Sequence, residues 1–416
     1  MADEVQTTPP RGWAVILLFR AQQSSVILVS YTFGLFLPFI REDLSITPLQ
    51  AGLLQGVWWI TAAGLSLPFG AWFSRFRPVP LALVSLVLGA PFLFVQALAP
   101  GFWLLLLGRF CFILFHTVNT PARALLLRQW CAPHQYALVQ SMGLSQHSVI
   151  LALAVSLSPW VIEGLGSWRI AYAVLGGFFT AQILAWLLVA REKHAPPPPP
   201  TDEEEGQSPW LALRKFPQGW LIAAVMLFLS STWTGIVTFL PTLWVDERDI
   251  SLTLGGPLLG FLYYGLIPGG FLGGWLLTKL HSRKVLLVVP ALLNAVFGVV
   301  ITLSEAPPLL MVFITGLGLV WIATPAIQVL PFEFPGVLPR EVAVLTGLIL
   351  TFMGVGFAVG PMLVGVVAQL TGSIQTGLIA LSLLTGLGVI AGLAYPDEPG
   401  ALHGGRTTPQ ASVRGS

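Results

Sequence analysis

Residues 12–38 read GWAVILLFRAQQSSVILVSYTFGLFLP, an apolar stretch that is interrupted by Arg20, two glutamines and two serines. A helix needs about 20 mostly apolar residues to cross the ~30 Å hydrocarbon core of a bilayer. If the span began after Ser25, only residues 26–40 would remain, which is too short to cross. The sequence therefore predicts that the polar residues lie inside the first membrane span.

The rest of the chain has the same character. Of its 416 residues, 55% are hydrophobic and 9% are charged, whereas a soluble domain carries about 25% charged residues. A transmembrane barrel would need ~10-residue strands of alternating polarity, and these runs are longer and more uniformly apolar. We predict twelve spans, at about 12–38, 49–73, 78–98, 102–125, 136–161, 168–190, 218–243, 253–277, 284–303, 307–330, 341–368 and 374–394.

The second half of the chain repeats the first. FLP at 36–38 recurs as FLP at 239–241. Three further matches are spaced by 204 residues: Gly70 with Gly274, Thr120-Pro121-Ala122 with Thr324-Pro325-Ala326, and Gly143-Leu144 with Gly347-Leu348. We therefore expect an all-α polytopic membrane protein with 12 transmembrane helices, arranged as two six-helix bundles that a pseudo-two-fold axis along the membrane normal relates. In that arrangement a site is expected near the midplane, between the bundles.

Lysine and arginine predict the orientation, because they accumulate in cytosolic loops. Of the 20 lysines and arginines, 15 fall in loops on the side of the N-terminus and two fall inside spans, which leaves Arg41, Arg169 and Arg248 on the other side. Both termini are therefore expected in the cytosol. The N-terminus has no basic segment and cleavage site of the kind that marks a removable signal peptide, so we expect a multi-pass protein of the cell membrane.

The run PPPPPTDEEE at 196–205 separates the spans six and six. Prolines followed by acidic residues cannot bury a core, so we predict a semi-rigid cytosolic linker. Within it, WLALRKF at 210–216 fits either a plain linker or a turn at the membrane surface. The predicted domains are an N-terminal six-helix bundle at 1–190, the linker at 191–217, a C-terminal six-helix bundle at 218–394 and a disordered cytosolic tail at 395–416.

Two loops carry related motifs: GAWFSRFRPVPL at 70–81, after the second span, and GWLLTKLHSRK at 274–284, after the eighth. Both resemble the gating motif Gly-x-Leu-x-Asp-Arg-x-Gly-Arg of the major facilitator superfamily. The chain resembles that superfamily over essentially its whole length, with further support from Arg109 in the fourth span and SWR at 167–169. The matching gating residues are Gly70, Arg75, Arg77, Gly274, Lys279 and Arg283.

The motifs also depart from the family. Ser74 and Thr278 stand where the family has Asp, and His281 stands where it has Gly, so the resemblance does not imply the usual acid–base lock. The Gly-Pro signature of drug antiporters is absent from the fifth span, where Ser158-Pro159 stands. The motifs of this chain more closely resemble those of the superfamily branches that carry small anions, such as cyanate-permease-like or organic-anion members.

The charges inside the spans also predict an anion. The 18 acidic residues fall in loops, termini or span ends, and none is near the midplane, whereas Arg20 and Arg109 lie within spans. Ionisable groups at membrane depth are costly and usually functional. Arginine suits a carboxylate because its planar fork donates two parallel hydrogen bonds. We therefore expect an anionic solute to pair with these arginines.

Residues three, four, seven and eleven apart share a helix face, so Arg20, Gln23, Ser24 and Tyr31 form one polar stripe in the first span. The family resemblance implies that the first and fourth spans border the central cavity. The predicted solute-binding residues are Arg20, Gln23, Ser24, Tyr31, Arg109, His116, Gln146, His147, Trp233 and Tyr263, and Trp58, Trp59, Tyr264 and Trp321 are further lining candidates.

Each of these residues also has a structural interpretation. Arg20 can extend to the cytosolic interface, Arg109 can support the fold, and the histidines and aromatic residues can serve packing.

We predict a secondary active or facilitative transporter that moves a small anion by alternating access. The alternative is a proton antiporter that exports neutral or cationic lipophiles, which would favour a membrane-embedded carboxylate. A sensor would bring a further soluble domain, and an enzyme would need an acid or cysteine near the histidines. No cofactor, metal or nucleic acid is expected. Protons are the candidate coupling ion, with His116 and His147 as their carriers, and the protein is expected to be a monomer in the lipid bilayer.

Overall fold

The computed structural model describes residues 8–73, 75–119, 122–132, 135–191, 209–268, 272, 279 and 282–396. Several helices begin at a proline, whose fixed φ and missing N–H suit the first helical position. The elements are α1 (Pro10–Tyr31), α2 (Phe33–Leu44), α3 (Pro48–Phe73), α4 (Pro78–Gly89), α5 (Pro91–Ala97), α6 (Phe102–Thr117), α7 (Ala122–Trp130), α8 (Tyr136–Leu165), α9 (Trp168–Val189), η2 (Pro209–Leu211), α10 (Ala212–Lys215), α11 (Gln218–Arg248), α12 (Leu252–Leu266), α14 (Arg283–Leu303), α15 (Pro307–Val320), α16 (Ala323–Val329), η3 (Leu330–Glu333), α17 (Pro339–Thr371), α18 (Ile374–Leu384) and α19 (Gly386–Ala394).

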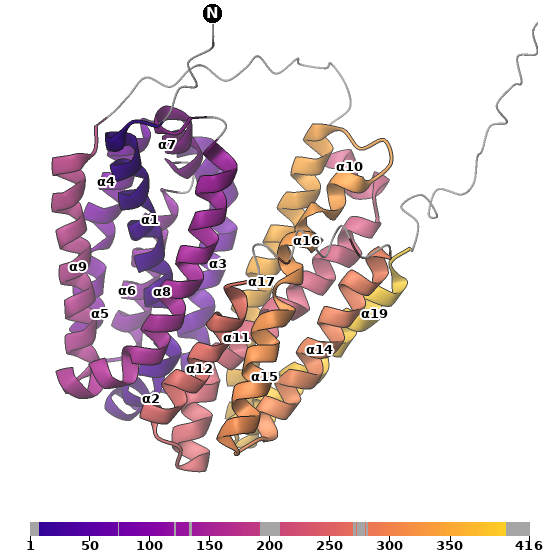
Figure 1. The fold of residues 1–416 in the computed structure, drawn as a ribbon. Coiled ribbons are helices and arrows are strands. Elements are labelled where there is room, and N and C mark those ends of the chain that lie inside the picture. Colours follow the sequence, from indigo (N-terminus) through magenta and orange to yellow (C-terminus); the bar gives the residue numbers. More distant parts are fainter. Residues whose placement is uncertain are drawn as a thin grey trace, which may run out of the picture.

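The helices form two bundles that lie side by side (Figure 1). The N-terminal bundle contains α1 to α9 and the C-terminal bundle contains α11 to α19, and no strand occurs in the described part of the chain. Each predicted span coincides with one helix or with two consecutive helices, although 269–271 and 273–277 of the eighth span lie outside the described residues. Among the described helices, nine are long and apolar enough to cross a membrane. The predicted all-α, twelve-span fold is confirmed.

The internal repeat is visible in the backbone. Ser45 and Asp249 are the two non-glycine residues with positive φ among the described residues, at 50° and 53°, and they are 204 positions apart. Each follows the first span of its bundle. Three residues of the sequence repeat, Thr120, Pro121 and Gly274, lie outside the described residues. The two left-handed residues give the repeat a structural basis that is independent of its sequence motifs.

A pair of carboxylates repeats with the same spacing. Asp43 accepts hydrogen bonds from the indole of Trp168 and the guanidinium of Arg169, both at 3.0 Å, at the start of α9. Its counterpart, Glu247, accepts from the backbone N–H of Ile374 at 2.6 Å, at the start of α18. In both bundles a carboxylate at the end of the first span therefore fixes the start of the sixth. This contact also explains why SWR opens α9.

Arg109 holds the N-terminal bundle together from inside. Its side chain is fully buried, and it donates to the Leu54 carbonyl at 2.9 Å, to Gln55 Oε1 at 2.9 Å and to the Tyr172 hydroxyl at 3.1 Å. Its guanidinium carbon also lies 3.9 Å from the centroid of the Phe33 ring. The structure therefore gives Arg109 a structural role, because neutral acceptors and an aromatic face stabilise its charge, and its contact with the solute remains a prediction.

The end of the predicted linker packs against the C-terminal bundle. Residues 209–215 form η2 and α10, and Lys215 Nζ lies 2.9 Å from Glu341 Oε2. Glu341 also accepts from the backbone N–H of Leu338 at 2.9 Å, at the start of α17. Most of WLALRKF therefore forms helical turns, and its place at the membrane surface remains a prediction. The rest of the linker, residues 192–208, lies outside the described residues, as do residues 397–416 of the predicted tail.

Replacing Arg109 with lysine should destabilise the protein. A lysine ammonium cannot reach three acceptors on two helices, α3 and α9, in the way a planar fork does, and each buried acceptor left unpaired costs about 1–3 kcal/mol. We expect Arg109→Lys to unfold at a clearly lower temperature in detergent, and Tyr172→Phe, which removes one partner, to have a smaller effect. If Arg109 instead contacted the solute directly, Arg109→Lys would lose transport while keeping its thermal stability.

Candidate functional site

The two bundles meet along three pairs of helices: α2 with α11, α3 with α17, and α8 with α12. Glycines allow the backbones to approach closely. A Cβ atom on Gly34 would collide with the carbonyl oxygen of Val237, and one on Gly52 would collide with that of Pro361. Small residues at such contacts are typical of helix packing in membranes. Gly34 lies in α2, the helix labelled at the end of the molecule opposite the N-terminus in Figure 1, and Gly52 lies near the start of α3, which follows α2 in the chain.

Six aromatic side chains form a closed circuit across this interface. Every neighbouring pair of ring centroids lies 4.6–5.9 Å apart, within the range of favourable aromatic contacts. Each member comes from a different span. In circuit order the members are Tyr31 (α1), Trp59 (α3), Phe357 (α17), Trp321 (between α15 and α16), Trp233 (α11) and Tyr263 (α12). We call this set the aromatic circuit.

The structure brings three of the predicted solute-binding residues, Tyr31, Trp233 and Tyr263, together in the aromatic circuit. The indole of Trp233 also hydrogen-bonds the Tyr31 hydroxyl, which links α11 to α1. Trp59 and Trp321, predicted as lining candidates, belong to the circuit as well. The sequence analysis missed Phe357, because one phenylalanine in an apolar span has nothing to distinguish it. The repeat holds a usable signal for Trp59, which lies 204 positions before Tyr263.

The polar stripe of the first span runs from the aromatic circuit toward the N-terminal end of α1. Arg20 is partly buried, and its Nη2 donates to the backbone carbonyl of Val139 at 2.8 Å, which places the side chain between α1 and α8. Gln23 is partly buried and Ser24 is buried. Arg20 lies about 16 Å along the helix from Tyr31, on the same face. Because Tyr31 contacts the C-terminal bundle, this face of α1 is directed toward the interface.

The structure does not group the predicted histidines. His116 lies near the end of α6, which packs against α3, α4 and α5, whereas His147 and Gln146 lie in α8, which packs against α12 and α1. All three side chains are partly buried. Helices α6 and α8 thus pack against different helices. That His116 and His147 carry protons along one route remains a prediction.

The described residues of the first gating motif lie at the end of α3 and the start of α4, and Arg283 of the second begins α14. Arg75 is exposed and lies over the ring of Trp72, 5.3 Å from its centroid. Arg77 and Lys279 are exposed, and Gly70 lies in the last turn of α3. Arg283 makes a bidentate ion pair with Glu333, at 2.8 and 3.0 Å. An acid–base contact therefore exists at the second motif, although it lies within the C-terminal bundle and its acid comes from η3.

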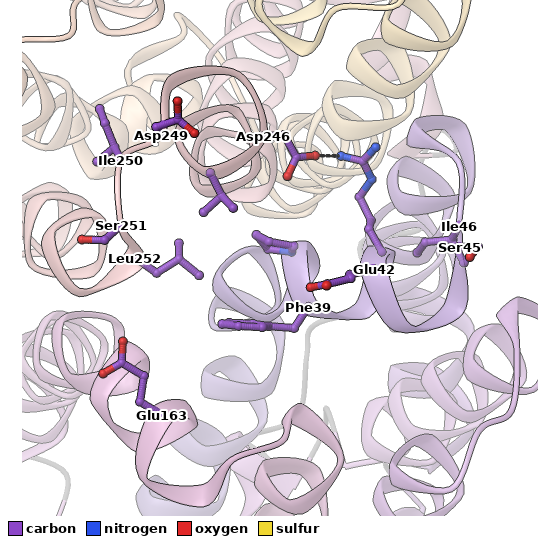
Figure 2. A pocket seen from close by; sticks show the side chains of 13 residues that line it. Phe39, Glu42, Ser45, Ile46, Glu163, Asp246, Asp249, Ile250, Ser251 and Leu252 are labelled. Carbon is purple, nitrogen blue, oxygen red and sulfur yellow. Dashed lines mark hydrogen bonds and ion pairs between the residues drawn. The ribbon is translucent and has the colours of Figure 1, made fainter.

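The opposite end of the interface holds a pocket of about 770 Å³ between α2, α8, α11 and the start of α12. Figure 2 shows Glu42, Glu163, Asp246 and Asp249 around it. Asp246 of the C-terminal bundle pairs with Arg41 of the N-terminal bundle at 2.5 Å, with side-chain exposures of 37% and 20%. Of the four salt bridges among the described residues, this one joins the two bundles. It closes the interface at this end.

Comparisons with known proteins agree with this architecture. Residues 23–336 match the family model of the Major Facilitator Superfamily. The hexuronate transporter of Bacillus subtilis (strain 168) is 26% identical over 389 residues, which cover 86% of this chain and 87% of that protein. A putative metabolite transport protein of Haemophilus influenzae is 25% identical, covering 67% of this chain and 70% of that protein.

Two solved structures share the fold. A bacterial homologue of the human lysosomal transporter Spinster, in an inward-facing and unoccupied conformation, gives a TM-score of 0.75 at 17% identity, covering 93% of this chain and 96% of that chain. The nucleoside transporter NupG gives 0.70 at 13% identity, covering 93% and 98%. This chain therefore belongs to the Major Facilitator Superfamily, and it is a multi-pass membrane transporter and not an enzyme.

Proposed function

We propose that this transporter carries a small anionic solute by alternating access, with its binding site at the interface around the aromatic circuit. The distribution of acidic groups is the observation that carries the proposal. The nine carboxylates among the described residues all lie in loops or in the terminal turns of helices: Glu42, Asp43, Glu163, Asp246, Glu247, Asp249, Glu305, Glu333 and Glu341. A cationic solute would favour a carboxylate at membrane depth, so this distribution favours an anion.

Arg20 lies on the same face of α1 as Tyr31, about 16 Å farther toward the N-terminal end of the helix, where it can attract an anion on its way to the circuit. Its helix face is directed toward the other bundle, as Tyr31 indicates. The B. subtilis relative supports an anion independently, because a hexuronate is by its name a sugar carboxylate. By analogy with bacterial relatives, we place the chain in the cell membrane. We further propose that both termini face the cytosol, that the bundles and linker follow the boundaries 1–190, 191–217 and 218–394, and that a monomer is the working unit.

In this proposed orientation the end at which Arg41 pairs with Asp246 is the outer one, so we infer an inward-facing state. Alternating access requires the contacts at Gly34, Gly52 and the ion pair to part when the outer side opens. The aromatic circuit then stands between the outer contacts and the inner end of the interface. It is the natural place for a solute that must be reached from each side in turn.

Uptake into proteoliposomes tests the proposed function, with radiolabelled glucuronate as the anionic probe and tetraphenylphosphonium as the cationic lipophile. We expect glucuronate uptake, and we expect Arg20→Gln to lower it by about tenfold or more, since a hydrogen bond to a charged group is lost. Arg20→Lys keeps the charge and should retain more activity. Transport of tetraphenylphosphonium without glucuronate would instead support the alternative, a lipophile exporter.

The ion pair between Arg41 and Asp246 should act as an outer latch. Partly exposed pairs contribute about 0.2–1 kcal/mol, so Asp246→Arg should shift the population toward outer-open states by a few-fold. Spin labels at Ser45→Cys and Ser251→Cys, in a background without Cys111 and Cys131, would report this as a longer distance. The double reversal, Arg41→Asp with Asp246→Arg, should restore the short distance. If it does not, a general disturbance of the loop explains the single variant better than a latch.

Proton coupling, if present, should depend on the histidines. The described spans contain no carboxylate near their midpoints, which leaves His116 and His147 as the candidate proton carriers. We expect the double variant His116→Gln, His147→Gln to take up the probe without acceleration by an inward proton gradient. A response to the gradient equal to that of the unmodified protein would exclude both residues as proton carriers.

A further inference from the structure

The aromatic circuit divides naturally into two parts. Two of its six contacts join the bundles: Tyr31 with Tyr263 at 5.7 Å, and Trp59 with Phe357 at 4.6 Å. Each of the other four contacts joins two rings of the same bundle: one contact in the N-terminal bundle and three in the C-terminal bundle. If the bundles rotate as rigid bodies, the two joining ring contacts and the hydrogen bond between Trp233 and Tyr31 must break, and the other ring contacts can persist. The rings then remain as a pair on the N-terminal bundle and as a row of four on the C-terminal bundle, with aromatic faces on both sides of the gap.

Three polar atoms in the circuit are buried without a hydrogen-bond partner: Nε1 of Trp59, Nε1 of Trp321 and the hydroxyl of Tyr263. The Tyr263 side chain is fully buried. An unsatisfied buried donor raises the free energy of the folded protein, because it has lost its hydrogen bonds to water and gained none. An indole nitrogen can only donate, and a tyrosine hydroxyl can donate as well as accept. The free hydrogen-bonding capacity of the circuit is therefore mainly that of donors.

In two of the helices that carry the circuit, the regular α-helical hydrogen bonding is interrupted at the circuit, while the backbone stays in the right-handed helical region. Tyr31 is the last residue of α1, directly before Thr32 and α2. Trp321 follows the last residue of α15, and α16 begins two positions later. Substrate sites of secondary transporters are typically formed where membrane helices are discontinuous. The position of these two breaks is independent of the ring contacts and of the unpaired donors, and it indicates the same location.

We infer that the aromatic circuit recognises a ring-shaped solute that carries a carboxylate and hydroxyl groups. The inference rests on the proposed transport of anions and makes it more specific. The apolar C–H faces of such a ring pack between the aromatic pair and the aromatic row. Its oxygen atoms accept hydrogen bonds from Tyr263, Trp59 and Trp321. These three donors are the specificity-determining residues, and a solute bound there would relieve the cost of leaving them unpaired.

Binding to the purified full-length protein tests this inference, with ligand-induced thermal stabilisation as the measurement. Three probes separate the chemical features: glucuronate has a ring and a charge, gluconate has the charge and hydroxyls on an open chain, and glucose has the ring without the charge. We expect glucuronate to bind most tightly. Tyr263→Phe keeps the ring and removes the donor, so it should weaken glucuronate binding about tenfold. Trp59→Phe and Trp321→Phe should weaken it as well.

Trp186→Phe is the matched control. The indole nitrogen of Trp186 is also buried and unpaired, but its ring packs against Phe19 within the N-terminal bundle, outside the circuit. This variant should bind glucuronate like the unmodified protein, and equal melting temperatures without ligand would show that all variants fold. Equal affinity for glucuronate and gluconate, with no effect of the three circuit variants, would overturn the inference while leaving anion transport intact. Binding of glucose or tetraphenylphosphonium, with no binding of either anion, would overturn the proposed function and the inference together.

Discussion

The hydrocarbon core offers no hydrogen-bond partners, so each spanning segment must satisfy its own backbone groups, and helices do so. The rest of the structure adapts to that constraint. Full charges move to the helix ends, where all four salt bridges of the described residues lie. The pairs formed by Asp43 and Glu247 with the starts of α9 and α18 are the clearest case. Because each joins the first and sixth spans of its bundle, the helix ends fix the order of the bundle while the span centres remain largely apolar.

Arg109 shows how a charge is tolerated at depth. It has no carboxylate partner among the described residues. Instead, a carbonyl, an amide oxygen and a hydroxyl accept from its guanidinium, and the Phe33 ring covers one face. Neighbouring polar contacts, such as Gln22 with Ser85 at 3.0 Å and Gln182 with Ser25 at 2.7 Å, are also internal to the N-terminal bundle. The polar residues of this bundle therefore serve largely to make it rigid, which suits a body that moves as a unit.

The interface between the bundles is built differently. Its close contacts are glycines against backbone and aromatic rings against one another, with one ion pair at one end. Van der Waals and aromatic contacts of this kind depend on shape, and they can be exchanged for others without leaving a buried charge unpaired. The bundles can thus separate at moderate cost. Rigid bundles joined by exchangeable contacts are what the proposed alternating access would require.

The sequence by itself determined the twelve spans and the repeat, because both depend on local properties: a run of apolar residues long enough to cross, and residues such as Thr324-Pro325-Ala326 that recur at a fixed distance. It also placed Tyr31, Trp233 and Tyr263 among the candidate site residues, since they are large and polar-tipped within spans. Only the tertiary structure decided that Arg109 points into its own bundle, while Phe357 and Trp59 meet across the interface. Which face of a helix is turned to which neighbour follows from the packing of all the helices together. The spacing within a single helix defines its faces but cannot say what lies opposite each one.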